Sequence, residues 1–108
     1  MDFTIYVEND RVRVKFVAAA TLGKLSKDGH SAAGDYADRV IRIFRGEYQR
    51  TQRHILLHEL GHHLVARQEL KPRTASEEDI CDLLTWLPLI LTDERNGDLR
   101  AFLGLTLA

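Results

Sequence analysis

Residues 56–64 read LLHELGHHL, and this stretch decides how the rest of the chain is organised. From Tyr48 to Glu69 the chain contains no proline and only one glycine, Gly61, so the segment is predicted to be a single helix. Gly61 costs about 1 kcal/mol relative to alanine in a helix interior, which suggests that another group approaches the backbone there. The apolar residues spread around most of the helical wheel and indicate a buried, central helix: Ile55, Leu56, Leu57, Leu60, Leu64 and Val65.

Two alternating stretches near the N-terminus predict a β-hairpin. DFTIYVE and RVRVKFV each alternate polar with apolar residues, and Asn9 and Asp10 lie between them. A two-residue loop at Asn9 and Asp10 places all the apolar side chains on one face, in the pairs Val7 with Val12, Ile5 with Val14 and Phe3 with Phe16. The polar residues then lie on a solvated face that requires no functional explanation.

The other elements are predicted from shorter signals. A strand is expected at about Asp38–Phe44, whereas the stretch from Ala18 to Gly34 predicts only a possible short helical piece between glycine turns. A second helix is expected at about Ala75–Leu87, and Pro88 should break or bend it. A turn at Asn96 and Gly97 and a short apolar C-terminal helix follow. The predicted fold is α+β, with a small antiparallel sheet packed on the central helix and a second helix.

Length and composition limit the organisation and the partners. A chain of 108 residues is expected to form one domain, residues 1–108. The formal net charge of −1 gives no general attraction to nucleic acid or to anionic membranes, so neither partner is expected. The longest nearly apolar run, Leu83–Leu91, is far shorter than the roughly 20 residues of a membrane span. Cys81 has no cysteine partner and no secretion signal is recognised, which predicts a cytoplasmic location.

His58, Glu59 and His62 form an H-E-x-x-H motif on the predicted central helix. Histidines four residues apart lie one turn above each other on the same helix face, where both can bind one zinc ion. Glu59 lies one step further round, beside the expected metal, and is predicted to take a proton from water as a general base. The motif therefore predicts a hydrolytic zinc site.

A catalytic zinc ion usually has three protein ligands, so a third donor is required. The segment SEEDICD, residues 76–82, contains four acids on the otherwise apolar second helix. Glu78, Asp82 and Thr85 form a narrow polar stripe on that helix, and a buried acid there would need a partner such as a metal. The acids of this stripe are candidate donors, and Glu77 and Asp79 take the place of Glu78 if the helix phase differs by one residue. On a solvent-facing helix the same stripe would be only the wet face.

These motifs resemble those of gluzincin metallopeptidases. TQRHILLHELGHHL is most similar to the active-site helix of ImmA/IrrE-type metallopeptidases, and Glu78-x-x-Cys81-Asp82-x-Leu84 resembles the E-x-x-A-N-x-F run of that family. The resemblance covers roughly Asp38 to Leu87 and implies a minimal zincin-like domain. It implies that His58, His62 and Glu78 bind zinc, that Glu59 is the general base, and that Asp82 accepts a hydrogen bond from a liganding histidine.

Three further residues are candidates for supporting roles at the site. His54 lies one turn before His58 and would support the oxyanion if it points into the cleft. Tyr36 and Tyr48 are candidates for donating a hydrogen bond to the tetrahedral intermediate. His63 lies about 100° from His62 on the helix, so a packing or surface role is expected for it.

Two function hypotheses follow. The first is a zinc metalloendopeptidase, a hydrolase whose substrate strand pairs with the strand Asp38–Phe44 at the edge of the cleft; the family resemblance implies a regulatory protein as the substrate. The second is a non-catalytic or regulatory protein-binding module that uses the zincin scaffold, with a phage as one candidate source. The arginines between Arg39 and Arg53, or the apolar C-terminus, would then bind a protein or nucleic-acid partner. The oligomeric state is not predicted.

Overall fold

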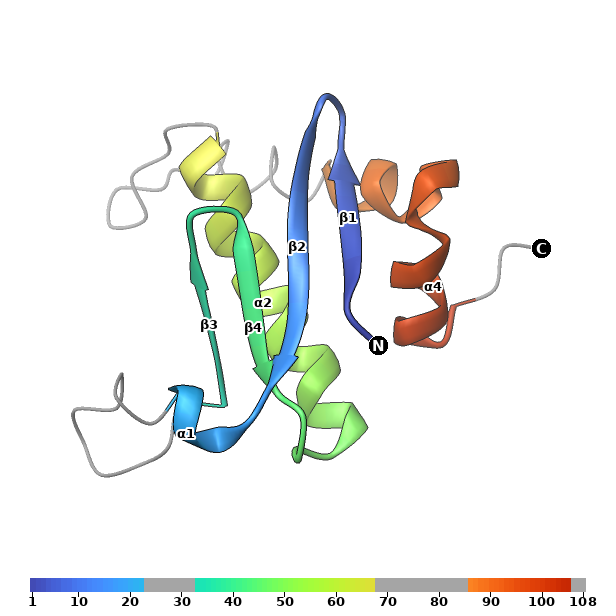
Figure 1. Cartoon of the computed structure of the whole chain (residues 1–108). Coiled ribbons are helices and arrows are strands. Elements are labelled where there is room, and N and C mark those ends of the chain that lie inside the picture. Colours follow the sequence, from blue (N-terminus) through green and yellow to red (C-terminus); the bar gives the residue numbers. More distant parts are fainter. Residues whose placement is uncertain (23–32, 68–85, 106–108) are drawn as a thin grey trace.

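The structure is a computed structural model that describes residues 1–22, 33–67 and 86–105. A four-stranded sheet, in the order β1-β2-β4-β3, carries a long helix on one face (Figure 1). The strands are β1 (Phe3–Val7), β2 (Asp10–Val17), β3 (Gly34–Ala37) and β4 (Val40–Phe44). The helices are α1 (Ala19–Leu22), α2 (Gln49–Arg67) and α4 (Gly97–Leu103), with a 3-10 helix, η3 (Glu94–Asn96), before α4. The predicted α+β class is confirmed.

The sheet is mixed, so the predicted antiparallel sheet is wrong. The pairs β1–β2 and β3–β4 are antiparallel, but β4 runs parallel to β2. A parallel pair needs a crossover of a dozen or more residues, and the chain between Val17 and Val40 supplies one that contains α1 and β3. The tight hairpin on this side joins β3 to β4, where Asp38 and Arg39 have φ of 48° and 64°. The predicted strand therefore begins at Val40, and β3 was not predicted.

The N-terminal hairpin forms with a register two residues away from the predicted one. Val7 pairs with Asp10, Ile5 with Val12 and Phe3 with Val14, so the two-residue loop is Glu8 and Asn9, where Glu8 has φ of 54°. Because side chains alternate with a period of two, this shift keeps the same residues on the core face. The shift places Asp10 inside β2, on the face towards α2, where its Oδ2 lies 3.1 Å from Nε2 of His63.

Helix α2 lies across the sheet and forms the core with it, and its predicted extent from about Tyr48 is confirmed as far as Arg67, the last described residue before the gap. Leu56, Leu60 and Leu64 are buried against the sheet, but Leu57 is 40% exposed, so α2 is not buried all round. No atom of the described residues lies within 4 Å of a Cβ built at Gly61, so the expected close approach to that glycine is not observed there. The buried sheet residues of the core are Phe3, Ile5, Val7, Val12, Val14, Ile41 and Ile43.

The C-terminal segment covers the edge of the sheet formed by β1 (Figure 1). Residues 86–92 are helical, and the helix continues through Pro88 to Thr92, so of the two predicted outcomes, a break or a bend, the break does not occur. The predicted C-terminal helix is α4. Asn96 is buried; its Oδ1 accepts a hydrogen bond from the Tyr6 N–H at 2.7 Å, and its Nδ2 donates to the Tyr6 carbonyl at 2.8 Å. Asn96, expected in a turn, thus pairs with β1 as a neighbouring strand would.

Several predictions lie outside the described residues. The start of the second predicted helix, the acids of residues 76–82, and with them Glu78 and Asp82, belong to the segment 68–85. Among the described residues, no helix combines the length and apolar character needed to cross a membrane.

Candidate metal centre

The two motif histidines converge on the exposed side of α2. Nε2 of His58 and Nε2 of His62 are 3.2 Å apart, and both side chains are exposed. Tetrahedral zinc ligands at about 2.0 to 2.1 Å from the metal lie about 3.4 Å from each other, so this separation fits two ligands of one ion as well as a histidine–histidine hydrogen bond. The four-residue spacing alone produces the convergence, because both residues belong to a regular helix.

Glu59 lies beside the two histidines and closer to the core. Its side chain is only 9% exposed, and one of its carboxylate oxygens and the two imidazole nitrogens all lie within 4.8 Å of one another. Burial raises the pKa of the Glu59 carboxyl, and positive charge on His62 and His58 acts in the opposite direction. A carboxylate with a raised pKa is a better proton acceptor near neutral pH. Glu59 therefore combines the position and the basicity expected of a general base.

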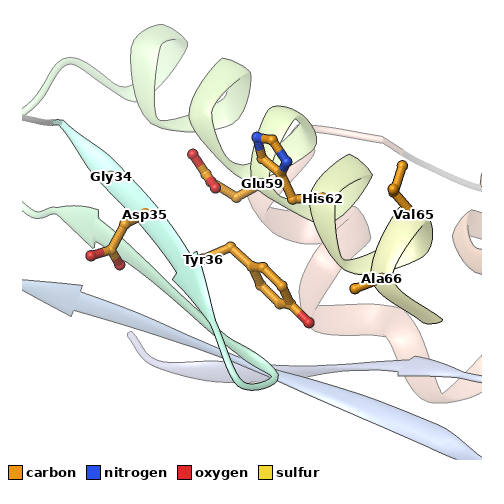
Figure 2. Close-up of a pocket in the computed structure, with 7 residues that line it drawn as sticks. All are labelled: Gly34, Asp35, Tyr36, Glu59, His62, Val65 and Ala66. Atoms are coloured by element: carbon orange, nitrogen blue, oxygen red, sulfur yellow. The ribbon is translucent and has the colours of Figure 1, made fainter. Parts of the chain in front are cut away.

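A pocket of about 470 Å³ opens between β3 and α2 (Figure 2). Its walls are Gly34, Asp35 and Tyr36 from β3, and Glu59, His62, Val65 and Ala66 from α2. A second hollow of about 260 Å³ is lined by Ala33, Gly34, His54, Ile55, His58 and Glu59. Gly34 and Glu59 border both hollows, so the histidines face one groove that follows the strand.

The strand beside this groove is β3, which corrects the prediction that the strand Asp38–Phe44 forms the edge. Strand β4 lies inside the sheet between β2 and β3, and β3 is the outermost strand on this side among the described residues. Gly34 is essential for the approach of β3 to α2, because a Cβ there would lie 2.3 Å from Cγ2 of Ile55 and 2.9 Å from the Arg42 carbonyl oxygen. The sequence marked Gly34 only as a turn, and no local signal revealed this contact.

Tyr36 lines the pocket as expected of a site residue, but its hydroxyl contacts another histidine. The Tyr36 oxygen lies 2.9 Å from Nδ1 of His63, at hydrogen-bond distance. His63 is only 2% exposed, and its other ring nitrogen, Nε2, lies 3.1 Å from the Asp10 carboxylate. The expected packing role of His63 is confirmed, and this histidine joins α2 to two strands. The partners of His63 were missed because Asp10, Tyr36 and His63 are far apart in sequence.

The remaining candidates fall in different places. His54 is exposed and borders the second hollow together with His58. Tyr48 is 84% exposed, directly before α2, and lines neither hollow. Glu78 and Asp82, with the alternatives Glu77 and Asp79, lie outside the described residues. The described residues thus offer two imidazoles and one carboxylate for a metal, a donor set that suits zinc.

Searches for related proteins found no matching family model, no matching curated protein and no matching solved structure for this chain. The fold is therefore described as α+β with a mixed sheet, and the resemblance to gluzincins rests on the motif residues alone.

Proposed function

We propose that this chain is a zinc-dependent endopeptidase that hydrolyses peptide bonds in an intracellular protein. The observation that carries the proposal is the convergence of the His58 and His62 nitrogens, 3.2 Å apart, with the nearly buried Glu59 carboxylate beside them. The groove along β3 adds support, since a peptidase needs space for an extended chain next to its metal.

The residues of the motif take distinct roles in this proposal. His58 and His62 hold the metal, and Glu78 is the third ligand that the family resemblance implies. Zinc, when bound, supplies a Lewis acid that makes water more acidic and a carbonyl group more electrophilic. Glu59 accepts the proton of the attacking water and passes it to the leaving amine nitrogen. With Glu78 as the third ligand, metal binding does not require Glu59, so the presence of Glu59 favours a catalytic site over a purely structural one.

The substrate is expected to add to the sheet as an extended strand along β3. An edge strand offers backbone N–H and C=O groups in a regular row, and a peptide that pairs with them is aligned without regard to its sequence. Side chains of the bound peptide would alternate between the solvent and the pocket beside Tyr36 and Val65. This arrangement places the backbone of the substrate next to Glu59 and His62.

Zinc stoichiometry tests the metal site. The protein purified without added metal is expected to contain one zinc per chain, and His58→Ala and His62→Ala should lose it, whereas the matched control His54→Ala should keep it. Glu78→Ala is expected to lose zinc, unlike Glu77→Ala and Asp79→Ala. Equal zinc in the wild-type protein and in both motif-histidine variants would refute the proposed site.

Glu59→Gln separates an enzyme from a binding module. This variant keeps the shape of the side chain but cannot accept a proton, so it should retain zinc and lose cleavage of a quenched fluorescent peptide library by a factor of at least about 100. If Glu59→Gln retained the full effect on a biological partner, the non-catalytic protein-binding function would be the correct one.

A further inference from the structure

The face of the sheet opposite α2 carries a row of positively charged side chains. Arg11, Arg13 and Lys15 of β2 are exposed on this face, because Val12 and Val14 between them point into the core. Arg42 of β4 lies directly opposite Lys15 and belongs to the same face. Arg11, Arg13, Lys15 and Arg42 together form the outer basic face. Figure 1 shows α2 on the other side of the sheet, behind these strands.

Among the residues that the structure describes, one of the four cations, Arg42, has a carboxylate partner. Arg42 donates from its guanidinium to Asp35, the residue opposite it on β3, at 2.8 Å from Nε to Oδ1. Arg13 donates to the Thr4 hydroxyl at 3.1 Å, a neutral partner. Within the described part of the chain, Arg11, Arg13 and Lys15 form no ion pair. Arg11, Arg13 and Lys15 follow one another on the same side of β2, so an external anion would reduce the repulsion between their like charges.

The same face also carries aromatic side chains. Tyr6 of β1 lies opposite Arg11, and Phe44 of β4 alternates with the core residue Ile43, so both rings belong to the outer face. Neither ring is part of the hydrophobic core, and both are only partly exposed. The guanidinium of Arg95 lies over the Tyr6 ring, 4.9 Å from its centroid. Planar groups next to a row of cations are typical of surfaces that stack bases.

We propose that the outer basic face binds single-stranded nucleic acid, a function separate from the metal site. Alternate residues of a strand are about 7 Å apart, so Arg11, Arg13 and Lys15 present their charges in a line that can follow a phosphate backbone. A duplex is the poorer fit, since its major groove admits a helix or a two-stranded ribbon but not the face of a four-stranded sheet. The net charge of −1 did not predict this basic surface, because the sum of charges over the whole chain does not show how the charges are distributed between its faces.

Fluorescence anisotropy with a labelled 20-nucleotide oligothymidylate and an RNA of the same length tests the proposal. Three phosphate contacts predict that log K falls with log salt with a slope of about −2.1, so that binding weakens about 18-fold between 50 and 200 mM salt. Arg11→Gln/Arg13→Gln/Lys15→Gln should remove most of this slope. Because these side chains are exposed, circular dichroism should show that the triple variant is folded. Each single variant should also weaken binding, which provides a second test.

Two matched variants and two competitors complete the experiment. Arg50→Gln removes one exposed charge from the first turn of α2 and should leave the affinity unchanged. Tyr6→Leu should weaken binding at least about fivefold without changing the salt slope, because it removes stacking and not charge. Equal loss in Arg50→Gln and Arg13→Gln, equal binding of a duplex, or equal competition by polyglutamate would overturn the proposal. Chelation of metal should leave oligonucleotide binding unchanged, so this test is independent of the peptidase proposal.

Discussion

His62 and His63 are neighbours in sequence, but they belong to opposite regions of α2. His62 lies in the exposed region, with its Nε2 3.2 Å from that of His58 at the mouth of the pocket. His63 lies in the buried region, 2% exposed, between Tyr36 and Asp10. Consecutive residues on a helix are rotated by about 100° from each other. This rotation leaves His62 available to a ligand and buries His63 in contact with the sheet.

Replacing a histidine removes different interactions in the two regions. The nitrogens of His58 and His62 face solvent, so replacing either residue removes a ligand and little packing. His63 brings polar groups of β2 and β3 to α2, so replacing it leaves a carboxylate and a hydroxyl in poorly solvated positions. Stability and metal binding should therefore respond to different histidines, and four predictions test that division.

The largest expected effect is on stability, from His63→Leu. Leucine fills most of the space but removes the histidine partner of Tyr36 and Asp10. Asp10 keeps its ion pair with Arg39 at 3.4 Å, and the loss of two largely buried polar contacts costs about 3 kcal/mol. His62→Leu, the matched control one residue away, should change the free energy of unfolding by no more than about 0.5 kcal/mol. Urea denaturation of the metal-free proteins measures both values. Equal losses in the two variants would show that the two regions do not differ.

The second prediction concerns zinc. Zinc at 100 times its dissociation constant should raise the free energy of unfolding of the wild-type protein by about 2.7 kcal/mol, because it binds only the folded state. His58→Ala and His62→Ala should show no such rise, whereas Tyr36→Phe, which alters the buried region, should show all of it. A rise that survives in both motif-histidine variants would place the metal elsewhere.

A smaller loss of stability is expected from Tyr36→Phe. The variant removes one hydrogen bond to Nδ1 of His63 and keeps the aromatic packing, so it should cost about 1 kcal/mol in urea denaturation. In the background of His63→Leu the same change should cost much less, because its partner is already absent. Additive losses would mean that the contact between Tyr36 and His63 does not contribute to stability.

The smallest effect is a pH dependence that arises from Glu59. Burial raises the pKa of Glu59 above its usual 4.5, so the folded state binds a proton more readily than the unfolded state does. The stabilisation from protonated Glu59 is present at and below pH 4.5 and is lost as the pH rises through the raised pKa of the folded protein. Glu59→Gln should remove this decline, so the metal-free variant should be at least as stable as wild type at pH 7. A steeper decline in the variant would contradict the assignment.

The parts of the site that the sequence predicted are those made by one helix. His58, Glu59 and His62 were found by spacing, and their arrangement on α2 agrees with that prediction because residues one turn apart meet on any regular helix. The hairpin was also predicted, but its register moved by two residues. Because the side chains alternate, only register shifts by an even number of residues keep the apolar side chains on the core face. In the observed register, Asp10 belongs to β2 and contacts His63.

Other parts of the fold could not be predicted from local patterns. Strand β3 has only four residues, GDYA, with no apolar alternation, and it exists because it pairs with β4. Asn96 beside a glycine has the composition of a turn, yet it is buried and hydrogen-bonded to the edge of β1, 90 residues away in sequence. The assignment of Glu78 as third ligand stays a prediction, since it belongs to residues 68–85.

The sequence by itself determined the long helix, the apolar faces of the strands and the convergence of two histidines, because each depends only on the geometry of a single element or hairpin. Tertiary structure alone decided that β3 and not β4 borders the pocket, that His63 is enclosed while His62 is open, and that four cations share one face of the sheet. These features depend on how distant segments pack, and packing free energies are summed over the whole molecule rather than over neighbouring residues.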